Sequence, residues 1–479
     1  MLCRLHLPLS PAQGERAKQL LSELDAYGII RAAGNERTAT GEATPVIIPP
    51  GILERRIEQM SHQPTSEQRQ AVLEALDDMN STTPMVRLLS GDVGTGKTTV
   101  FALLAACVHD AGGEVAIMLP SSDMVVQVAS EMQGWWPDIR LEKVTGKHKG
   151  EQEPARIKLG TSALLHRYQE WEPTLTVVDE QQKHSVSQRQ YLCRHGGHLL
   201  EATATAMPRT LASVLFGLIP ISRLTKPHTP KRIHTTLHDA DDVSARQRLF
   251  EDVRQTLAAG DQVLVIFAAR DKKEADKLEK QVEELDMEAS GIEECPTPTY
   301  VVPLDEGATA WEAFLPEGAV TRLHGKMKVA DRNRTMARMR AGECQVLCAT
   351  TAAEVGLNLP RLRRVVIYNP ERLGLTQLHQ IRGRVARNGG EGWCDLLSQV
   401  KRLSAAASER LNAMCQTQDG LRLAEMDMRQ RGLGDLSSQK NQQSGSASGG
   451  ILLARKLTLS SFEAAHKLMP SEIWDSQSP

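Results

Sequence analysis

Two series of short apolar runs follow each other along the chain, and charged or amphipathic stretches separate their members. The first series consists of GEVAIMLP (113–120), IRLEKVTG (139–146), LTVVDE (175–180) and GHLLEATAT (197–205). Apolar strands that alternate with helical segments are typical of a parallel, doubly wound sheet. The first half of the chain is therefore expected to fold as an α/β domain.

The second series begins near residue 261 and repeats this pattern. Its apolar runs are DQVLVIFAA (261–269), AVTRLHG (319–325), CQVLCATT (344–351), RRVVIYNP (363–370) and GWCDLLS (392–398). Charged helical stretches such as 271–285 and 329–342 lie between them. The pattern predicts a second α/β domain, and a length of 479 residues is too great for a single core.

Composition narrows the class of protein. The chain is 41% hydrophobic and 24% charged, as in an ordinary soluble protein, and no run approaches the roughly 20 apolar residues of a membrane span. The eight cysteines include no CxxC pair and the N-terminus does not resemble a secretory signal, so a cytoplasmic protein is expected. Cys193, His195 and His198 cluster without a second ligand group, so zinc is not expected. With a formal net charge of −2, any nucleic-acid contact must come from a local basic groove.

The most informative segment is residues 84–112, PMVRLLSGDVGTGKTTVFALLAACVHDAG, which predicts an apolar strand, a glycine loop and an amphipathic helix. Gly91, Gly96, Lys97 and Thr98 satisfy the pattern G-x-x-x-x-G-K-[ST] in this context. Glycines let backbone N–H groups approach phosphate oxygens, and the helix N-terminus adds its positive dipole end. Lysine then meets the β- and γ-phosphates and threonine ligates magnesium. The segment predicts nucleotide binding.

Two adjacent carboxylates, Asp179 and Glu180, end the apolar run at 175–180. Two solvated acids at a strand tip would be the simplest interpretation. After a P-loop, however, they suit the second magnesium motif, in which Asp179 holds Mg²⁺ and Glu180 deprotonates the attacking water. Farther along, QLHQIRGRVARN (377–388) places Arg384 and Arg387 three apart, on one face of an expected helix. They either form a solvated basic face or complete the nucleotide site from the second domain.

Together these motifs resemble superfamily 2 helicases, and more narrowly the RecG family of branched-DNA translocases; the transcription-repair coupling translocase shares much of this motor. The resemblance covers roughly residues 60–445. Its motifs are GDVGTGKT (91–98), DEQQ (179–182), TATAMPRTL (203–211), LHGKMK (323–328), ATTAAEVGLNLP (349–360), NPERLGLTQLHQIRGRVAR (369–387) and, in the tail, AEMDMRQRGLGDLSSQKNQQSG (424–445).

The resemblance implies two tandem RecA-like parallel-sheet domains that form a helicase core. We expect a short N-terminal α+β segment (1–60), motor domain 1 with the P-loop (61–225), motor domain 2 (226–400) and a C-terminal helical hairpin with a tail (401–479). It also implies a DNA-stimulated ATP hydrolase that uses ATP and Mg²⁺ to remodel branched or duplex DNA in repair, recombination or replication. Such a protein would work in the bacterial cytoplasm, at the nucleoid, with no membrane partner.

The resemblance also assigns roles to individual residues. It assigns ATP hydrolysis to Lys97, Glu180, Arg384 and Arg387. ATP binding falls to Gln68, Gly91, Gly94, Gly96, Lys97, Thr98 and Thr99, and Mg²⁺ binding to Thr98 and Asp179. Coupling or DNA contact falls to Gln182, Thr203, Thr205, Arg209, Thr350, Thr351, Glu354, Arg429, Arg431 and Gln443. Lys147, Lys149, Lys326 and Lys328 are further candidates for phosphate contacts.

The chain departs from the family's usual pattern at several positions, none of which is an expected catalytic residue. His62 replaces an aromatic residue, Gln182 a histidine, Asn358 an aspartate and Ala386 a glycine, and the tail carries two extra residues around Asn441 and Gln442. Because glutamine cannot carry a proton charge, Gln182 is expected to alter coupling, but an active ATPase is still expected.

The first part of the chain differs most from the family, because only about sixty residues precede the motor where RecG carries a wedge domain. Residues 14–30 form an amphipathic pattern and residues 31–48 suit a hairpin. These resemble half of a winged helix, or else a simple brace for the motor. A protein partner is therefore expected to supply substrate choice.

Three hypotheses of function remain open. The leading one is a DNA translocase or helicase of RecG type. The second is a motor that tracks along DNA and remodels a protein or RNA polymerase complex. The third is a nucleotide-gated DNA-binding recruitment protein that hydrolyses ATP weakly because of Gln182 and Asn358.

Overall fold

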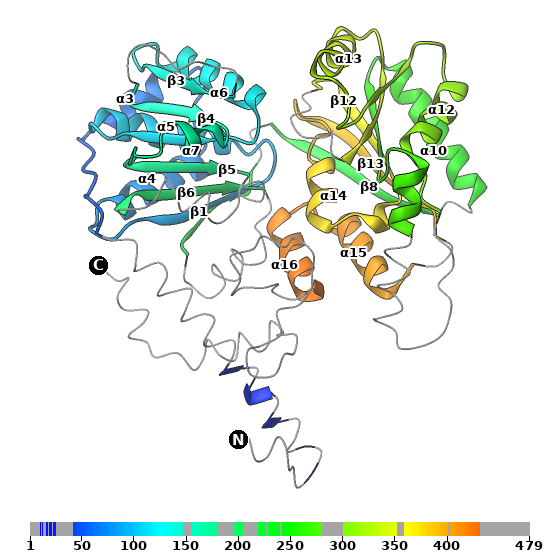
Figure 1. Ribbon diagram of the computed structural model, residues 1–479, viewed down its shortest axis with the longest axis horizontal. Coiled ribbons are helices and arrows are strands. Elements are labelled where there is room, and N and C mark those ends of the chain that lie inside the picture. Colours follow the sequence, from blue (N-terminus) through cyan, green and yellow to red (C-terminus); the bar gives the residue numbers. More distant parts are fainter. Residues whose placement is uncertain are drawn as a thin grey trace. The chain divides into compact units, whose positions relative to one another are not determined.

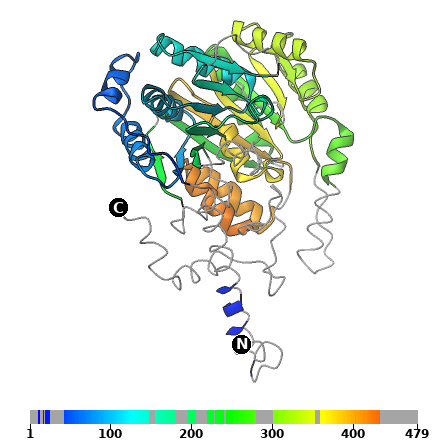
Figure 2. The same ribbon diagram turned by 60° about the vertical axis from the view of Figure 1, so that its left-hand side comes forward.

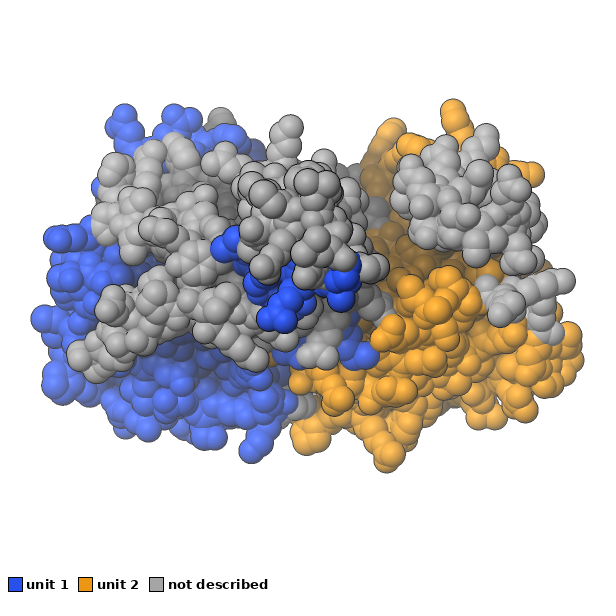
Figure 3. Space-filling view, turned by 90° about the horizontal axis from the view of Figure 1, so that it is seen from below, with its two compact units in different colours: residues 1–226, 424–479 blue, residues 227–423 orange. Residues whose placement is uncertain are grey.

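The computed structural model (Figure 1) describes most of the chain in two compact units. Unit 1 comprises residues 1–226 and 424–479, and unit 2 comprises residues 227–423 (Figure 3). Each unit has its own sheet and hydrophobic core. The described residues are 42–146, 155–180, 196–204, 219–226, 229–239, 242–279, 300–351, 359–400 and 403–431, with scattered positions between 10 and 24.

Unit 1 is built on a seven-stranded sheet in the order β3-β4-β2-β5-β6-β1-β7, and all its strand pairs are parallel. Hydrophobic clusters lie on both faces of this sheet, and successive residues of β2 point to opposite faces. Ile117 packs in the cluster that includes α5 and α6, and Met118 packs in the cluster that includes α7. The elements are α3 (Ile52–Glu58), α4 (Ser66–Met79), β1 (Val86–Gly91), α5 (Lys97–Asp110), β2 (Val115–Met118), α6 (Ser122–Trp135), β3 (Leu141–Val144), β4 (Ile157–Gly160), α7 (Ala163–Arg167), β5 (Leu175–Asp179), β6 (His198–Thr203) and β7 (Ile221–Leu224).

The register of three neighbouring strands brings distant motifs to one edge of this sheet. Ser90 of β1 lies opposite Thr203 of β6, and Ala202 of β6 lies opposite Asp179 of β5. Because the strands are parallel, their carboxyl ends share an edge. The P-loop, the Asp179 motif and the Thr203 motif therefore all begin at this edge.

Helix α5, which follows the P-loop, is buried on every side. Each residue from Thr99 to Val108 is buried, because the helix packs against the sheet and also contacts α3 and α4. The sequence predicted an amphipathic helix here, and that prediction was wrong. A helix that is apolar all round is a core helix.

Unit 2 repeats the parallel design with six strands in the order β10-β11-β9-β12-β13-β8. Helices α10 and α12 pack their apolar sides onto it, with Trp311 fully buried between them and the sheet. The elements are β8 (Lys231–Asp239), α10 (Val243–Ala258), β9 (Gln262–Phe267), α12 (Leu304–Phe314), β10 (Val320–Leu323), α13 (Val329–Ala341), β11 (Val346–Thr350), β12 (Leu362–Tyr368), η4 (Pro370–Arg372), α14 (Leu375–Arg382), β13 (Gly390–Ser398) and α15 (Ala405–Gln416).

The predicted fold class, two parallel-sheet α/β domains of RecA type, is confirmed. Three strands had not been predicted: β4, β7 and β8. In β4, Lys158 interrupts the apolar pattern, yet it is buried because its ammonium donates to the Ala155 carbonyl at 2.8 Å and lies 4.2 Å from the Trp171 ring centroid. Strands β7 and β8 lie at sheet edges and keep polar, partly exposed side chains.

The segment before the P-loop is part of the unit 1 core. Val46, Leu53, Ile57 and Met60 belong to the same hydrophobic cluster as α5, and Figure 2 shows the blue α3–α4 segment along the outside of the unit. Residues 25–41, which include most of the proposed wing, lie outside the described part of the chain. The described residues from 42 to 60 therefore pack onto the core of unit 1.

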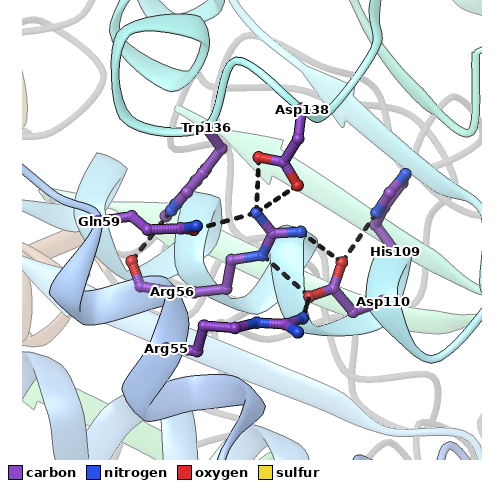
Figure 4. A network of polar contacts seen from close by, with 7 residues as sticks. All are labelled: Arg55, Arg56, Gln59, His109, Asp110, Trp136 and Asp138. Atoms are coloured by element: carbon purple, nitrogen blue, oxygen red, sulfur yellow. Dashed lines mark hydrogen bonds and ion pairs between the residues drawn. The ribbon is translucent and has the colours of Figure 1, made fainter.

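An ion network around the buried Arg56 holds this segment against the rest of unit 1 (Figure 4). Arg56 of α3 is only 3% exposed and makes two hydrogen bonds to Asp110, at 2.6 and 2.9 Å. It also bonds Asp138 at 2.9 Å, and its backbone carbonyl accepts the indole N–H of Trp136. Burial would raise the pKa of Asp110, but hydrogen bonds from Arg56, His109 and Arg55 outweigh it and lower the pKa to about 2. The network joins α3 to the C-terminal ends of α5 and α6.

The described chain ends in two consecutive helices, α15 and α16 (Gly420–Arg431), joined by residues 417–419. Ser404 caps α15 by accepting the Ala407 N–H at 3.3 Å. The tail after 431, which includes Asn441, Gln442 and Gln443, lies outside the described residues.

Candidate nucleotide site and motor elements

The P-loop connects β1 to α5 through two glycines with left-handed backbones. Gly94 has φ +89°, and Gly96, which caps α5, has φ +79°. The positive φ favours glycine at position 96, and a Cβ there would lie 2.1 Å from the amide nitrogen of Gln68 and displace it. The first-turn N–H groups of α5 are therefore presented at the edge of the sheet where an anion can bind.

The Lys97 side chain folds back over this loop. Its ammonium donates to the Gly91 carbonyl at 2.6 Å and to the Asp92 carbonyl at 3.2 Å. Thr95 also donates its hydroxyl to Asp92 O, at 2.8 Å. These bonds hold the positive charge over the loop, at the mouth of the expected phosphate site.

Gln68 has two roles in the structure and is almost fully buried. Its carbonyl oxygen accepts the Thr65 N–H at 2.8 Å, which completes a capping box at the start of α4. Its amide donates to the Thr95 carbonyl of the P-loop at 2.8 Å. The residue expected to read adenine is thus joined directly to the phosphate loop.

His62, which replaces an aromatic residue, lies beside the first turn of α5. Its Nε2 is 3.3 Å from the Thr99 hydroxyl, and its ring packs edge-on against Trp135 at 5.4 Å between centroids. Thr99 is buried, whereas Thr98 and Lys97 are half-buried. The imidazole is therefore held next to the nucleotide-binding turn.

The carboxylate pair ends β5 as predicted, with a strained backbone at the second acid. Asp179 is buried, and its carboxylate accepts the Glu180 N–H at 3.0 Å. Glu180 has φ +55°, a left-handed conformation that costs a non-glycine residue about 1 kcal/mol, and its N–H also reaches the Ala202 carbonyl at 2.9 Å. Asp179 and Glu180 are thus fixed at the carboxyl end of β5 by two hydrogen bonds from the Glu180 N–H.

The donor set suits magnesium. Mg²⁺ prefers a few oxygen ligands from the protein, with the remainder from phosphate and water. The Asp179 carboxylate and the Thr98 hydroxyl supply such oxygens at the same edge of the sheet. The described residues hold no group of three His, Cys, Asp or Glu that could form an all-protein cage. Of the three clustered Cys and His residues, only His198 is described, and it accepts the Met85 N–H inside the core.

The expected coupling motifs are only partly described. Thr203 is fully buried at the end of β6. Thr350 is buried at the end of β11 in unit 2, and Thr351 follows it, half-buried. Lys326 and Lys328 are exposed. The predicted residues Lys147, Lys149, Gln182, Thr205, Arg209, Glu354 and Asn358 lie outside the described residues.

Arg384 and Arg387 do not lie on a helix, contrary to the prediction. Helix α14 ends at Arg382, and turns follow it. Ala386, between the two arginines, has φ +50° and donates its N–H to the Leu362 carbonyl at 2.9 Å. The turn is thus tied to the start of β12, and its left-handed residue explains why glycine is usual there. Both arginines are half-buried.

Two residues that the sequence had not singled out anchor this region of unit 2. The buried Arg382 donates to the Met414 and Thr417 carbonyls at 2.6 and 2.8 Å and so caps α15. The fully buried Asn369 has φ +50° and bonds the backbone of Val302 and Tyr300. Nothing in the local sequence distinguishes them from surface polar residues; the buried environment identifies them.

Arg429 and Arg431 lie within α16, but their side chains are outside the described part of the structure, as is Gln443. No helix among the described residues is long and apolar enough to cross a membrane.

Two tandem parallel-sheet units, the first with a P-loop and a strand-end carboxylate pair, define a RecA-like helicase core. Comparison of the sequence with protein families agrees with this class. Residues 63–198 match the AAA domain family, and residues 304–389 match the helicase conserved C-terminal domain. Within this class the chain is similar to RecG over most of its length, as its motifs predicted. It is 33% identical over 439 residues to the ATP-dependent DNA helicase RecG of Synechocystis sp., covering 87% of this chain and 49% of the relative.

Two further comparisons point to the same family. The RecG of Bacillus subtilis is 32% identical over 396 residues, covering 78% of this chain and 54% of the relative. Among solved structures, RecG bound to a three-way DNA junction matches with a TM-score of 0.64 and 26% identity, covering 92% of this chain and 56% of that one. The chain therefore spans about half the length of the curated relatives it matches.

Proposed function

We propose that this protein is an ATP-dependent DNA translocase of RecG type that remodels branched or duplex DNA. The observation that carries the proposal is the edge of the unit 1 sheet, where the P-loop, Asp179 and Glu180 come together from β1 and β5. Relatives with the same motor are named as ATP-dependent DNA helicases.

ATP binding is assigned to the P-loop. Backbone N–H groups from Gly94 to Thr99 would receive phosphate oxygens, and the Lys97 ammonium would exchange the Gly91 carbonyl for the β- and γ-phosphates. Gln68 would reach adenine only by changing its present bond to the P-loop. Nucleotide binding would therefore reorganise both side chains.

Hydrolysis is assigned to the carboxylate pair. Thr98 and Asp179 would hold Mg²⁺, which when bound neutralises charge on the β- and γ-phosphate oxygens. Glu180 would take the proton of the attacking water, because it directly follows the magnesium ligand Asp179 at the end of β5. Arg384 and Arg387 of unit 2 would stabilise charge that develops on the transferred phosphoryl group.

DNA is the proposed track and substrate. Lys326 and Lys328, exposed between β10 and α13, are suited to phosphate contacts, which position a motor without reading sequence. A structure of RecG on a three-way junction motivates branched DNA as the substrate. A protein partner would supply further substrate choice, and activity on DNA would place the protein at the bacterial nucleoid.

The proposal is tested by measuring ATP turnover with duplex, forked, three-way and single-stranded DNA. Branched DNA is expected to stimulate turnover most, and the Lys97→Ala variant should show none. Equal turnover with and without every DNA would reject a DNA motor.

A further inference from the structure

Two adjacent residues at the start of α4 contact two distant parts of unit 1. Gln68 donates to the P-loop carbonyl of Thr95 at 2.8 Å. Glu67, one position earlier, binds the segment that ends the first stretch of unit 1, residues 225–226. The chain enters unit 2 at Pro227. The first turn of α4 therefore touches both the phosphate loop and the junction between the units.

The Glu67 carboxylate uses both oxygens at the junction. Oε2 accepts the backbone N–H groups of Thr225 at 2.7 Å and of Lys226 at 3.1 Å, and Oε1 accepts the Thr225 hydroxyl at 2.5 Å. Burial would raise the pKa of Glu67, but the hydrogen bonds from Thr225 and Lys226 outweigh it and lower the pKa. Three convergent donors form a specific clasp, unlike a surface ion pair.

The rest of α4 holds the strand that leads to the junction. Glu74 accepts from Ser222 of β7 at 2.5 Å and from Arg87 of β1 at 2.8 Å. Arg87, itself buried, also bonds Asp78 and Ser222 at 2.8 Å. Residues 67, 74 and 78 are seven and four apart, so they share one face of the helix. Helix α4, β7 and the junction are thus connected as one element.

We propose that Glu67 is a positioning residue that couples the nucleotide site to the junction between the units, with α4 as the connecting element. The inference rests on the proposed function only in requiring that the P-loop binds a nucleotide. Glu67 acts through Gln68 and the P-loop and not on the nucleotide itself, and the inference needs neither DNA nor hydrolysis.

The coupling follows from how closely Gln68 packs on the P-loop. The Gln68 amide donates to the Thr95 carbonyl at 2.8 Å and lies so near Gly96 that an added Cβ would be 2.1 Å from it, so a nucleotide that moves this part of the loop would displace that side chain. Gln68 Oε1 also holds the Thr65 N–H, so its displacement alters the capping box. The first turn then shifts, and Glu67 shifts with it. Thr225 and Lys226 therefore respond to the nucleotide.

Hydrogen exchange of the Thr225 and Lys226 amides tests the clasp directly, with and without a non-hydrolysable ATP analogue. Glu67→Ala is expected to speed exchange of both amides about tenfold in the absence of analogue. Glu131→Ala is the matched control, because Glu131 is also a helix glutamate with one side-chain partner, Gln127, at 2.9 Å. It should leave both amides unchanged.

The analogue should change exchange of the two amides in the wild type but not in Glu67→Ala. Protection of the Gly94–Thr99 amides in the same samples reports that the analogue is bound. The affinity of Glu67→Ala for the analogue should lie within about twofold of the wild-type affinity. A dye pair, one on each unit, should then report an analogue-induced distance change that is smaller by at least about half in Glu67→Ala. Thr225→Val, which keeps the backbone donors, should give an intermediate response.

Two results would overturn the inference: a wild-type protein that binds the analogue without any change at Thr225 and Lys226, or a Glu67→Ala response equal to that of Glu131→Ala. Either outcome leaves the motor proposal standing. Conversely, absence of DNA-stimulated turnover removes the proposed function but not the nucleotide-dependent clasp, since neither measurement contains DNA.

Discussion

The Lys97 ammonium lies 2.6 Å from the carbonyl oxygen of Gly91, six residues back along the P-loop. The lysine charge is thus already positioned over the loop by the protein's own backbone. Reaching a phosphate requires only a side-chain rotation, because the loop itself is shaped by Gly94 and Gly96. The Lys97 ammonium itself therefore needs little movement before it can meet an anion.

Lys97→Ala should therefore abolish ATP hydrolysis, because the described P-loop has no other cation over it. Its melting temperature should stay close to wild type, since the lysine only bonds loop carbonyls. Turnover is measured by phosphate release and folding by thermal melting. Wild-type turnover in a folded Lys97→Ala protein would reject the assignment of the P-loop.

Glu180→Gln should retain ATP binding but slow hydrolysis by on the order of 10²–10⁴, because an amide cannot accept the proton of water. Binding is checked with a fluorescent nucleotide and turnover in single-turnover experiments. Loss of binding instead would mean that Glu180 serves the fold, through its left-handed backbone at the end of β5.

Arg387→Ala should lower turnover far more than ATP affinity, since its charge is needed mainly in the transition state. Its position in a turn, one residue after the left-handed Ala386, means that no helix is interrupted by the change. Comparison of kcat with the nucleotide dissociation constant decides the matter. Equal losses in both would place Arg387 in ground-state binding or in folding.

Replacing Arg429 and Arg431 together with alanine should leave DNA-stimulated ATP turnover largely intact and abolish strand or branch displacement. Both residues lie in α16, in the segment that resembles the RecG coupling hairpin. Surface ion pairs in a simple brace would contribute little, and the double variant would then displace strands normally. An unwinding assay beside an ATPase assay separates the two.

Arg56→Ala should reduce the free energy of unfolding by about 3 kcal/mol at neutral pH, because it removes the principal partner of a buried carboxylate. Arg69→Ala is the control: its pair with Glu54 is about half exposed and should contribute less than about 1 kcal/mol. Chemical denaturation of both variants measures the difference, and equal losses would contradict a role for burial.

The same network predicts a pH dependence. The pKa of Asp110 falls from 3.8 to about 2 on folding, so its contribution to stability is complete above pH 4 and is lost as the pH falls from about 4 to about 2. Screening by water on the exposed Asp138 side limits this loss to about 1–2 kcal/mol. Arg56→Ala should flatten that part of the wild-type stability curve; an unchanged slope would assign the dependence to other carboxylates.

Local pattern was enough to predict most strands of both sheets, all except β4, β7 and β8, and the nucleotide loop. Runs such as LTVVDE and DQVLVIFAA are strands because parallel strands are buried on both faces and need continuous apolar residues. The P-loop is equally local, since its glycines are required by the dihedrals of neighbouring residues. Such features depend on a few adjacent positions, and sequence alone therefore determined them.

Tertiary structure decided what depends on distant partners. Lys158 occupies a buried strand only because Ala155 and Trp171 satisfy its charge. The burial of α5 on all sides comes from α3 and α4, which no pattern within α5 reveals. Glu67 reads as an ordinary surface glutamate until folding brings Thr225 to it across 158 positions of sequence. The role of each of these side chains depends on the hydrogen-bond donors, charges and apolar groups around it. Those neighbours come from distant parts of the sequence and meet only when the chain folds.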